Sequence, residues 1–275
     1  MSIINILEMD GTNKSTVTLP AVFQTPYRPD VIQKVYNHLN SYTFQRQGRY
    51  PAAGQMVSAE SRNTGLGIAR IARARGEGFP RAGQAAGVAS VRHGRLAHPP
   101  VSWKNIYKKV NKKEKLLALC SAIAATTNGE LIKRRGHQIK DNLQLPIVIS
   151  NEIESIVKSK DLEKVLLKLG LEDDLKRTFI RRNKSVHKNG TNRRSALSVL
   201  IIVGNDEKIG RLNNSLPGIT VKPVKFVSVL DLAPGSKPAR LTIYSENAIK
   251  ELTNLKSTSN IISEMKAQWR KIYSL

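Results

Sequence analysis

The segment from Arg46 to Pro100 constrains this chain more than any other part of its sequence. Its 55 residues contain nine arginines, nine glycines, two glutamates and no lysine. It has no apolar period long enough to build a hydrophobic core, and loops of this length are uncommon in compact domains. We therefore expect the segment to be disordered in the free protein or held by something outside it. Its charge indicates that this partner is polyanionic.

A second basic segment runs from Lys176 to Arg194 and carries eight Lys or Arg residues and no acid. The two segments contribute +7 and +8, so they hold 15 units of the formal net charge of +24. Two strongly basic segments on a less charged body are typical of nucleic-acid-binding proteins. A membrane surface is a weaker explanation, because we find neither a basic amphipathic helix nor a lipidation signal. We expect a nucleic-acid partner and no membrane partner.

The rest of the chain, about 200 residues, is long enough for one sizeable core. We expect residues 1–45 and 101–275 to form a globular α/β domain, 46–100 an extended loop, and 176–194 a second basic arm within that domain. Cys120, the only cysteine, lies in an apolar helical pattern and is interpreted as a buried residue in a reducing compartment. Neither a signal peptide nor a transmembrane span is predicted, so the expectation is a soluble intracellular protein.

Short apolar runs alternate with helical patterns along the domain. This alternation predicts an α/β fold with a largely parallel sheet covered by helices on both faces. The expected elements are a hairpin of Ser2–Glu8 and Thr16–Phe23, a helix over 30–43, a helix from Trp103 or Lys112 to Thr127, a helical stretch around Leu162–Leu169, strands at Leu145–Ile149, Leu197–Val203, Phe226–Leu230 and Leu241–Tyr244, and closing helices at Asn247–Leu255 and Ile261–Tyr273.

Catalytic patterns have little support. No phosphate-binding glycine loop follows a strand: Gly65-x-Gly67 lies in the arginine-rich segment, and a tight turn explains Gly204-Asn205-Asp206 better. The five histidines (His38, His93, His98, His137 and His187) show no metal-ligand spacing with acidic or cysteine partners. The acids at 172–174 are interpreted as a helix start. We expect no cofactor, no metal and no enzyme activity; an enzyme hypothesis rests on fold analogy alone.

The basic residues are the candidate functional set. Arginine contacts phosphates bidentately and stacks on bases, so nine arginines without a lysine favour structured RNA, although a flexible polybasic loop that binds any nucleic acid stays open. The second arm is either an RNA clamp or a solvated loop. Lysines near the start of the second long helix oppose its dipole, which suits an anionic partner or a plain solvated face. The candidate RNA-binding residues are Arg46, Arg49, Arg62, Arg70, Arg73, Arg75, Arg81, Arg92, Arg95, His98, Lys108, Lys112, Lys176, Arg177, Arg181, Arg182, Lys184, Lys188, Arg193 and Arg194.

Several motifs in order resemble one known family, the universal ribosomal protein four of the large subunit in its archaeal and eukaryotic form. The resemblance covers nearly the whole chain. The motifs that carry it are Ser58-Ala59-Glu60-Ser61, Thr64-Gly65, Ala69-Arg70-Ile71 with Arg73, Ala82-Gly83-Gln84, Gly94-Arg95, Ala97-His98-Pro99-Pro100, Cys120-Ser121-Ala122, Gly136-His137, Leu145-Pro146, Pro217-Gly218-Ile219-Thr220 and Leu232-Ala233-Pro234-Gly235.

The resemblance implies a structural protein of the cytoplasmic large ribosomal subunit. Its partners would be large-subunit ribosomal RNA, neighbouring ribosomal proteins and the nascent polypeptide, because the family's long loop helps form the constriction of the exit tunnel. The residues implied to approach the tunnel are Thr64, Gly65, Ala69, Arg70, Ile71 and Arg73. The tip departs from the family pattern, with Arg62, Asn63 and Leu66 where tryptophan, glycine and arginine are common. The alternative is a free RNA-binding or regulatory protein that is not integral to the ribosome.

Overall fold

A computed structural model describes residues 3–140, 143–184, 196–205 and 207–254, with the backbone only for 181–184 and 254. The chain divides into two compact units. Unit 1 comprises residues 1–40 and 109–275, and unit 2 comprises residues 41–108. Unit 2 is therefore inserted between two segments that belong to one body.

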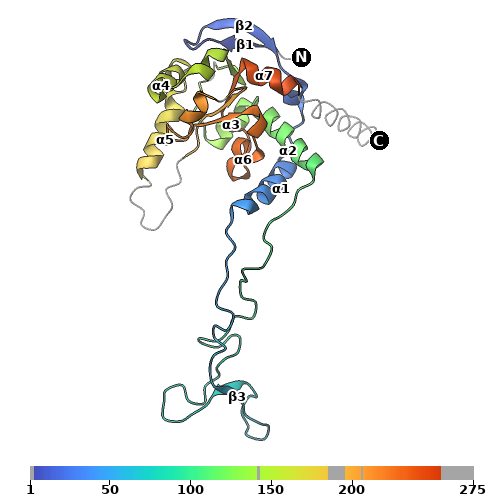
Figure 1. Ribbon diagram of the computed structural model, residues 1–275, viewed down its shortest axis with the longest axis vertical. Coiled ribbons are helices and arrows are strands. Elements are labelled where there is room, and N and C mark those ends of the chain that lie inside the picture. Colours follow the sequence, from blue (N-terminus) through green and yellow to red (C-terminus); the bar gives the residue numbers. More distant parts are fainter. Residues whose placement is uncertain (1–2, 141–142, 185–195, 206, 255–275) are drawn as a thin grey trace, which may run out of the picture. The chain divides into compact units, whose positions relative to one another are not determined.

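Unit 1 contains a six-stranded sheet in the order β2-β1-β5-β8-β6-β7. Figure 1 labels the hairpin of β1 and β2 that forms one edge of this sheet. Only β2 runs antiparallel to its neighbour, and the other five strands are parallel. The strands are β1 (Ile3–Leu7), β2 (Asn13–Thr18), β5 (Ile147–Ile149), β6 (Leu200–Val203), β7 (Thr220–Pro223) and β8 (Thr242–Ser245). The sheet thus joins a short N-terminal hairpin to a parallel core.

Helices of unit 1 lie between the parallel strands in the sequence, except for α7, which follows the last described strand. They are α1 (Pro29–Asn40), α2 (Lys112–Ala125), α3 (Gly129–Arg135), α4 (Ser159–Lys168), α5 (Glu172–Lys184), α6 (Val229–Leu232) and α7 (Glu246–Asn254). Short 3-10 turns lie at Ala21–Gln24, Asn151–Ser155, Ile209–Leu212, Val224–Phe226 and Pro234–Ser236. In α3, the Asn128 side chain accepts from two backbone amides at the start, and Gly136 ends the helix at φ 103°, which favours glycine.

Two hydrophobic clusters lie on opposite faces of the sheet. Along β6, Leu200 and Ile202 join a cluster with α1, α2, α6 and α7, whereas Ile201 and Val203 join a cluster with α4 and α5. Successive side chains of a strand point to opposite faces, so a strand buried on both faces must be apolar throughout. The predicted α/β class, with a largely parallel sheet and helices on both faces, is confirmed.

Some expected elements differ from the structure. The strand expected at Phe226–Leu230 is wrong: a 3-10 turn and α6 occupy this stretch, and the strand is β7, just before it. The helix after the arginine-rich segment begins at Lys112 rather than at Trp103. The second strand of the hairpin is shifted to Asn13–Thr18. The closing helix expected at Ile261–Tyr273 lies outside the described residues.

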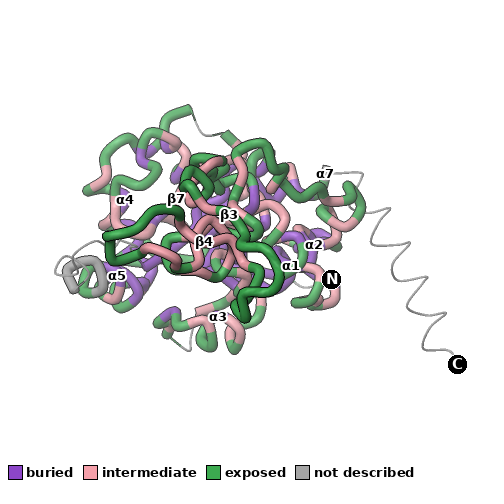
Figure 2. Tube along the Cα trace, turned by 90° about the horizontal axis from the view of Figure 1, so that it is seen from below, coloured by how far each residue is buried: buried purple, intermediate pink, exposed green. Residues whose placement is uncertain are grey.

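Unit 2 contains a two-stranded antiparallel sheet of β3 (Ala59–Ser61) and β4 (Ala72–Ala74), and a 3-10 turn at Ser41–Thr43. From residue 42 to residue 108 no side chain is buried, and in Figure 2 the segment has only the exposed and intermediate colours. The absence of a hydrophobic core follows from its composition, since large apolar residues are sparse among its arginines and glycines. The β3–β4 pair was not predicted.

Candidate nucleic-acid interface

The two ends of unit 2 are joined by a set of contacts that we call the stem, residues 41–48 and 102–108. The backbone amide of Lys108 donates to Ser41 Oγ at 3.0 Å. The rings of Tyr42 and Tyr107 stack with centroids 5.3 Å apart and planes at 10°. A Cβ atom at Gly48 would lie 3.0 Å from the backbone nitrogen of Ser102, so the two chain segments approach closely. The stem holds the entry and exit of the insertion together.

The β3–β4 hairpin fixes the residues expected at the tip. Ser61 Oγ donates to the Arg70 carbonyl at 2.6 Å, closing the connection that contains Thr64, Gly65 and Ala69. The guanidinium of Arg73 donates to the Gly83 carbonyl at 3.0 Å. These bonds shape the backbone and leave the connection itself exposed to solvent.

Most candidate RNA-binding side chains between Arg46 and Lys112 are exposed. The exposed set is Arg46, Arg49, Arg62, Arg70, Arg75, Arg81, Arg92, His98, Lys108 and Lys112, while Arg73 and Arg95 are half-buried. One guanidinium in this set has an acidic partner, since Arg75 forms an ion pair with Glu60. The set therefore presents a surface of dominant positive charge.

The second arm begins inside a helix. Residues 176–184 belong to α5, and its first turn supplies the acids that the arm itself lacks. Lys176 pairs with Glu172 at 2.5 Å, and Arg177 donates to Asp174. The side chains of Arg181, Arg182 and Lys184, and the whole of Lys188, Arg193 and Arg194, lie outside the described part of the chain. Lys176 is exposed, whereas the Arg177 side chain is only 21% exposed.

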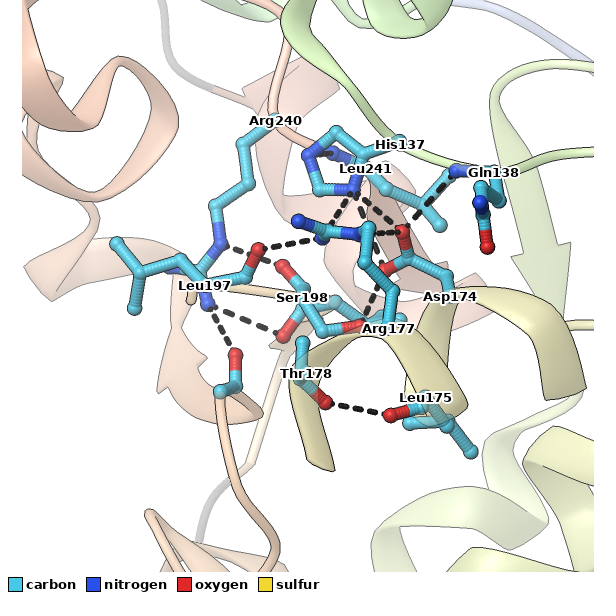
Figure 3. Close-up of polar contacts among 12 residues, drawn as sticks. His137, Gln138, Asp174, Leu175, Arg177, Thr178, Leu197, Ser198, Arg240 and Leu241 are labelled. Carbon is cyan, nitrogen blue, oxygen red and sulfur yellow. Dashed lines mark hydrogen bonds and ion pairs between the residues drawn. The ribbon is translucent and has the colours of Figure 1, made fainter. Parts of the chain in front are cut away.

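A buried polar network fixes the start of α5 against the sheet (Figure 3). The Asp174 carboxylate is fully buried and accepts from Arg177 Nε at 2.9 Å, from Ser198 Oγ at 2.5 Å and from the Gln138 amide at 3.2 Å. Burial opposes its ionisation, but these donors and His137 together hold the pKa of the carboxyl well below its usual range. Asp174 is therefore ionised at neutral pH.

His137 completes this network from the end of α3. Its Nδ1 lies 3.2 Å from Asp174, and its Nε2 accepts from the Leu241 amide at 3.4 Å. Burial lowers the pKa of His137, although its contacts with Asp174 oppose that shift. An imidazole that donates through Nδ1 and accepts through Nε2 is neutral. The positive charge that balances Asp174 is thus that of Arg177.

Arg240 is a second buried charge, only 1% exposed. It donates to the carbonyl oxygens of Ser198, Val199, Gly218 and Asp231 at 2.8–3.3 Å. Burial lowers the pKa of its guanidinium to about 10, so it stays protonated at neutral pH. Backbone carbonyls replace water around this cation and join the residues just before β6 to the segment that precedes β7.

The sequence patterns missed this network. His137 and Asp174 are 37 residues apart, and the rule of metal-ligand spacing does not address such a pair. The acids at 172–174 do begin a helix, as predicted, but Asp174 is buried rather than solvated. A signal was present in retrospect, since Arg177 lies one turn after Asp174. Cys120 is buried as expected, and burial raises the pKa of its thiol to about 11.

At the carboxyl ends of the parallel strands, where open α/β sheets bind ligands, internal contacts lie beside an open pocket lined by residues such as Gly204, Pro223 and Asn247. Glu154 accepts from the Gly204 amide at 3.0 Å and from Ser245 Oγ at 2.7 Å. The Asn247 amide donates to Asn151 Oδ1 at 2.8 Å. In the described part of the chain no group of three or more His, Cys, Asp or Glu side chains is placed to hold a metal. None of the described helices is long and apolar enough to cross a membrane.

These features define a basic α/β protein with an exposed, arginine-rich insertion. The chain belongs to the ribosomal protein L4/L1 family, whose model matches residues 17–255. This is a family of ribosomal proteins rather than of enzymes, which excludes the enzyme hypothesis.

Similar proteins come from several archaea and share the name large ribosomal subunit protein uL4. The protein of Haloquadratum walsbyi is 38% identical over 254 residues, which is 90% of this chain and 98% of the relative. That of Methanosphaera stadtmanae is 36% identical and covers 93% and 98%. That of Saccharolobus islandicus is 38% identical and covers 90% and 92%. The similarity therefore extends across both units of the chain.

Proposed function

We propose that this chain is a structural constituent of the cytoplasmic large ribosomal subunit, where it binds the subunit's ribosomal RNA. One observation carries the proposal: a segment of 42–108 without a buried side chain presents exposed arginines, inside a chain of the ribosomal protein L4/L1 family. Such a segment cannot gain stability from its own core and gains it from a polyanion instead. The names of the archaeal relatives support the same assignment.

The chemistry of the insertion supports RNA over other polyanions. Guanidinium groups contact phosphates bidentately and stack on exposed bases, so arginines suit folded RNA in which both are presented. Exposed arginines such as Arg49, Arg62 and Arg92 are distributed along the whole insertion. We propose that both sides of the insertion contact RNA, with neighbouring ribosomal proteins as further partners.

We propose further that the connection between β3 and β4 approaches the nascent polypeptide in the exit tunnel. This step rests on the motifs from Thr64 to Arg73 that resemble the family. Two features support it: the connection is closed by the bond between Ser61 and Arg70, and its residues Thr64, Gly65 and Ala69 are exposed. The connection also contains Gly65 and Gly67, where the absence of a side chain lets the backbone pass close to a partner.

The second arm, 176–194, is proposed as an additional RNA contact on the body. Lys176 is exposed at its start. Arg177 is committed to Asp174 and to the Leu197 carbonyl, so we assign it to positioning the arm rather than to direct contact with phosphate. Within this basic segment, Arg177 therefore holds the arm in position, and exposed residues such as Lys176 are proposed to contact RNA.

Sedimentation of native extract through a high-salt gradient tests the main proposal. We expect the chain to migrate with the large subunit at fixed stoichiometry, because contacts buried in the assembled particle resist salt. Release into light fractions would favour the alternative, a free RNA-binding or regulatory protein. A chain that lacks 46–100 serves as a matched variant, and we expect it to keep a folded body while losing stable incorporation.

Cross-linking tests the tunnel assignment. A photoreactive group attached at Thr64→Cys should reach a stalled nascent polypeptide, whereas the same group at Ala52→Cys, in the same insertion but outside the tip, should reach RNA or protein of the subunit. The buried Cys120 does not compete for the reagent, because its thiol is inaccessible. Equal cross-linking of the nascent polypeptide from both positions would contradict the placement of the tip.

A further inference from the structure

Exposed aromatic side chains gather on the stem and the residues next to it. They are Tyr42, Phe44, Tyr50, Trp103 and Tyr107. Aromatic residues make up only 5% of the chain, and five of them lie within two short stretches, 42–50 and 103–107. Large apolar rings are normally buried, so five exposed rings on two stretches that contact each other indicate a binding site.

Part of this set is already arranged by stacking. Tyr42 and Tyr107 lie nearly parallel, 5.3 Å between centroids, and the guanidinium carbon of Arg46 lies 5.1 Å from the centre of the Tyr107 ring. Rings and guanidinium planes in such a stack have little freedom to lose when a further flat group is added. The stem thus presents a preorganised stacking surface.

Trp103 offers the largest open ring on the stem. It is 72% exposed, and its backbone is fixed between Ser102, which lies against Gly48, and Asn105, whose side chain accepts from the Tyr107 amide at 3.1 Å. Its immediate neighbour Lys104 is also exposed. A fixed backbone, an open indole and an adjacent cation are the components of a base-stacking site.

The chemistry of the surface selects its occupant. Phosphates alone would need the cations but not the rings, and an apolar protein partner would need the rings but would leave Arg46, Lys104 and Lys108 without anionic partners. Unpaired nucleotides satisfy both, because each offers a flat base to a ring and a phosphate to a cation. Paired bases are less suitable, since their faces are occupied within the duplex.

We propose that the stem is a stacking surface for unpaired RNA bases, with Trp103 as its principal ring and the Tyr42–Tyr107–Arg46 stack as its second element. The inference rests on the proposed RNA-binding function and specifies the mode of recognition at this place. In this proposal the stem binds unpaired nucleotides through their bases, and the rest of the insertion contacts phosphate groups.

Intrinsic fluorescence provides a direct readout. The chain has two tryptophans, Trp103 and Trp269, so Trp269→Phe leaves Trp103 as the only indole reporter. In this background we expect short oligouridine to quench the fluorescence at saturation. Heparin, a polyanion without bases, and a blunt RNA duplex of similar length should bind through charge and leave the emission nearly unchanged.

Affinity measured by anisotropy of a labelled oligouridine gives the second readout. We expect Trp103→Leu to weaken binding by about 5- to 100-fold, the range typical of removing one stacked ring, with the salt dependence unchanged because every phosphate keeps its cation. Trp103→Phe should recover most of the affinity. The matched control is Phe226→Leu, an aromatic that is 74% exposed beside Lys225 on unit 1, and it should have no effect.

The outcomes separate this inference from the proposed function. Equal quenching by heparin and oligouridine, or undiminished affinity of the Trp103→Leu variant, overturns the stacking surface while RNA binding stands. Failure of the unmodified chain to bind any RNA overturns the proposed function itself. Since Trp103 and Phe226 are exposed, we expect the thermal unfolding of their variants to match that of the chain in which they are made.

Discussion

His137 Nδ1 lies 3.2 Å from both carboxylate oxygens of Asp174 and joins α3 to α5 across a gap of 37 residues in the sequence. The imidazole is neutral in this position, since its Nε2 must accept from the Leu241 amide. The pair therefore makes the stability of the body sensitive to pH, in a direction that follows from the lowered pKa of the histidine.

Acidification should destabilise the free protein well above the pH at which carboxyl groups titrate. The imidazole has its ordinary pKa of 6.5 in the unfolded chain and a lower one in the folded chain. As the pH falls through 6.5, the unfolded state takes up a proton that the folded state does not, so the free energy of unfolding decreases. Melting temperatures between about pH 7.5 and pH 5 measure this slope. His137→Gln should flatten it, whereas His98→Gln, an exposed site in unit 2, should not.

Removing the buried carboxylate should be costly. Asp174→Asn leaves the partly buried guanidinium of Arg177 without its counter-charge, and we expect a loss of about 3–5 kcal/mol in the free energy of unfolding. Chemical denaturation of the free protein measures it. The neighbouring Asp173 is exposed, so Asp173→Asn should change stability by only about 0.5 kcal/mol. A loss for Asp174→Asn as small as the one expected for Asp173→Asn would mean that the network does not stabilise the body.

The carbonyl cage of Arg240 predicts a comparable loss. Arg240→Met fills a similar volume but removes the guanidinium donor from four carbonyl oxygens, of which those of Val199 and Gly218 keep a backbone amide donor. We expect about 3–5 kcal/mol of destabilisation in urea unfolding. Arg211 is exposed on the same body, and Arg211→Met should be nearly silent. An unchanged free energy of unfolding for Arg240→Met would show that apolar packing can replace the contacts of Arg240 with these carbonyl oxygens.

Charge reversal at the tip should separate assembly from stability. We expect Arg70→Glu to impair incorporation into the large subunit while the melting temperature of the free protein stays unchanged, because Arg70 is exposed. The salt slope for binding large-subunit RNA should fall by about one for each phosphate that is no longer neutralised. Arg211→Glu, with the same change of charge on unit 1, is the control. A sharp fall in the melting temperature of the Arg70 variant would place this arginine in the protein's own structure.

Limited proteolysis tests the expectation that 46–100 is disordered without RNA. Trypsin cleaves after arginine, and the exposed Arg49, Arg62 and Arg81 should be cut well before sites in the sheet. Mass spectrometry of the early fragments identifies the sites. Resistance of the whole insertion in the free protein would mean that the stem and the β3–β4 pair order it without RNA.

The sequence predicted the body because both faces of its sheet are buried. Runs such as Leu200–Val203 are apolar throughout, and the helices carry apolar residues at helical spacing. The errors fall where this signal is weak. The edge strand Thr220–Pro223 is only partly buried and contains Lys222, so the apolar stretch that follows it was mistaken for a strand.

The candidate site was predictable to a different degree. The exposed arginines follow from composition alone, because large apolar residues are too sparse in this segment to bury them. The network around Asp174 and the cage around Arg240 depend on residues brought together from distant parts of the chain, and no local pattern encodes such contacts. The stack of Tyr42 on Tyr107 is of the same kind, since 65 positions separate the two rings.

The position of β8 in the sheet has a consequence for synthesis. It is the last strand of the described chain, yet it lies between β5 and β6 and pairs with both. Because a chain is made from its N-terminus, the two halves of the sheet have nothing to join them until residues 242–245 have been added. The cationic insertion is complete long before that moment. During synthesis, the arginine-rich insertion is therefore able to bind polyanions before unit 1 can complete its fold.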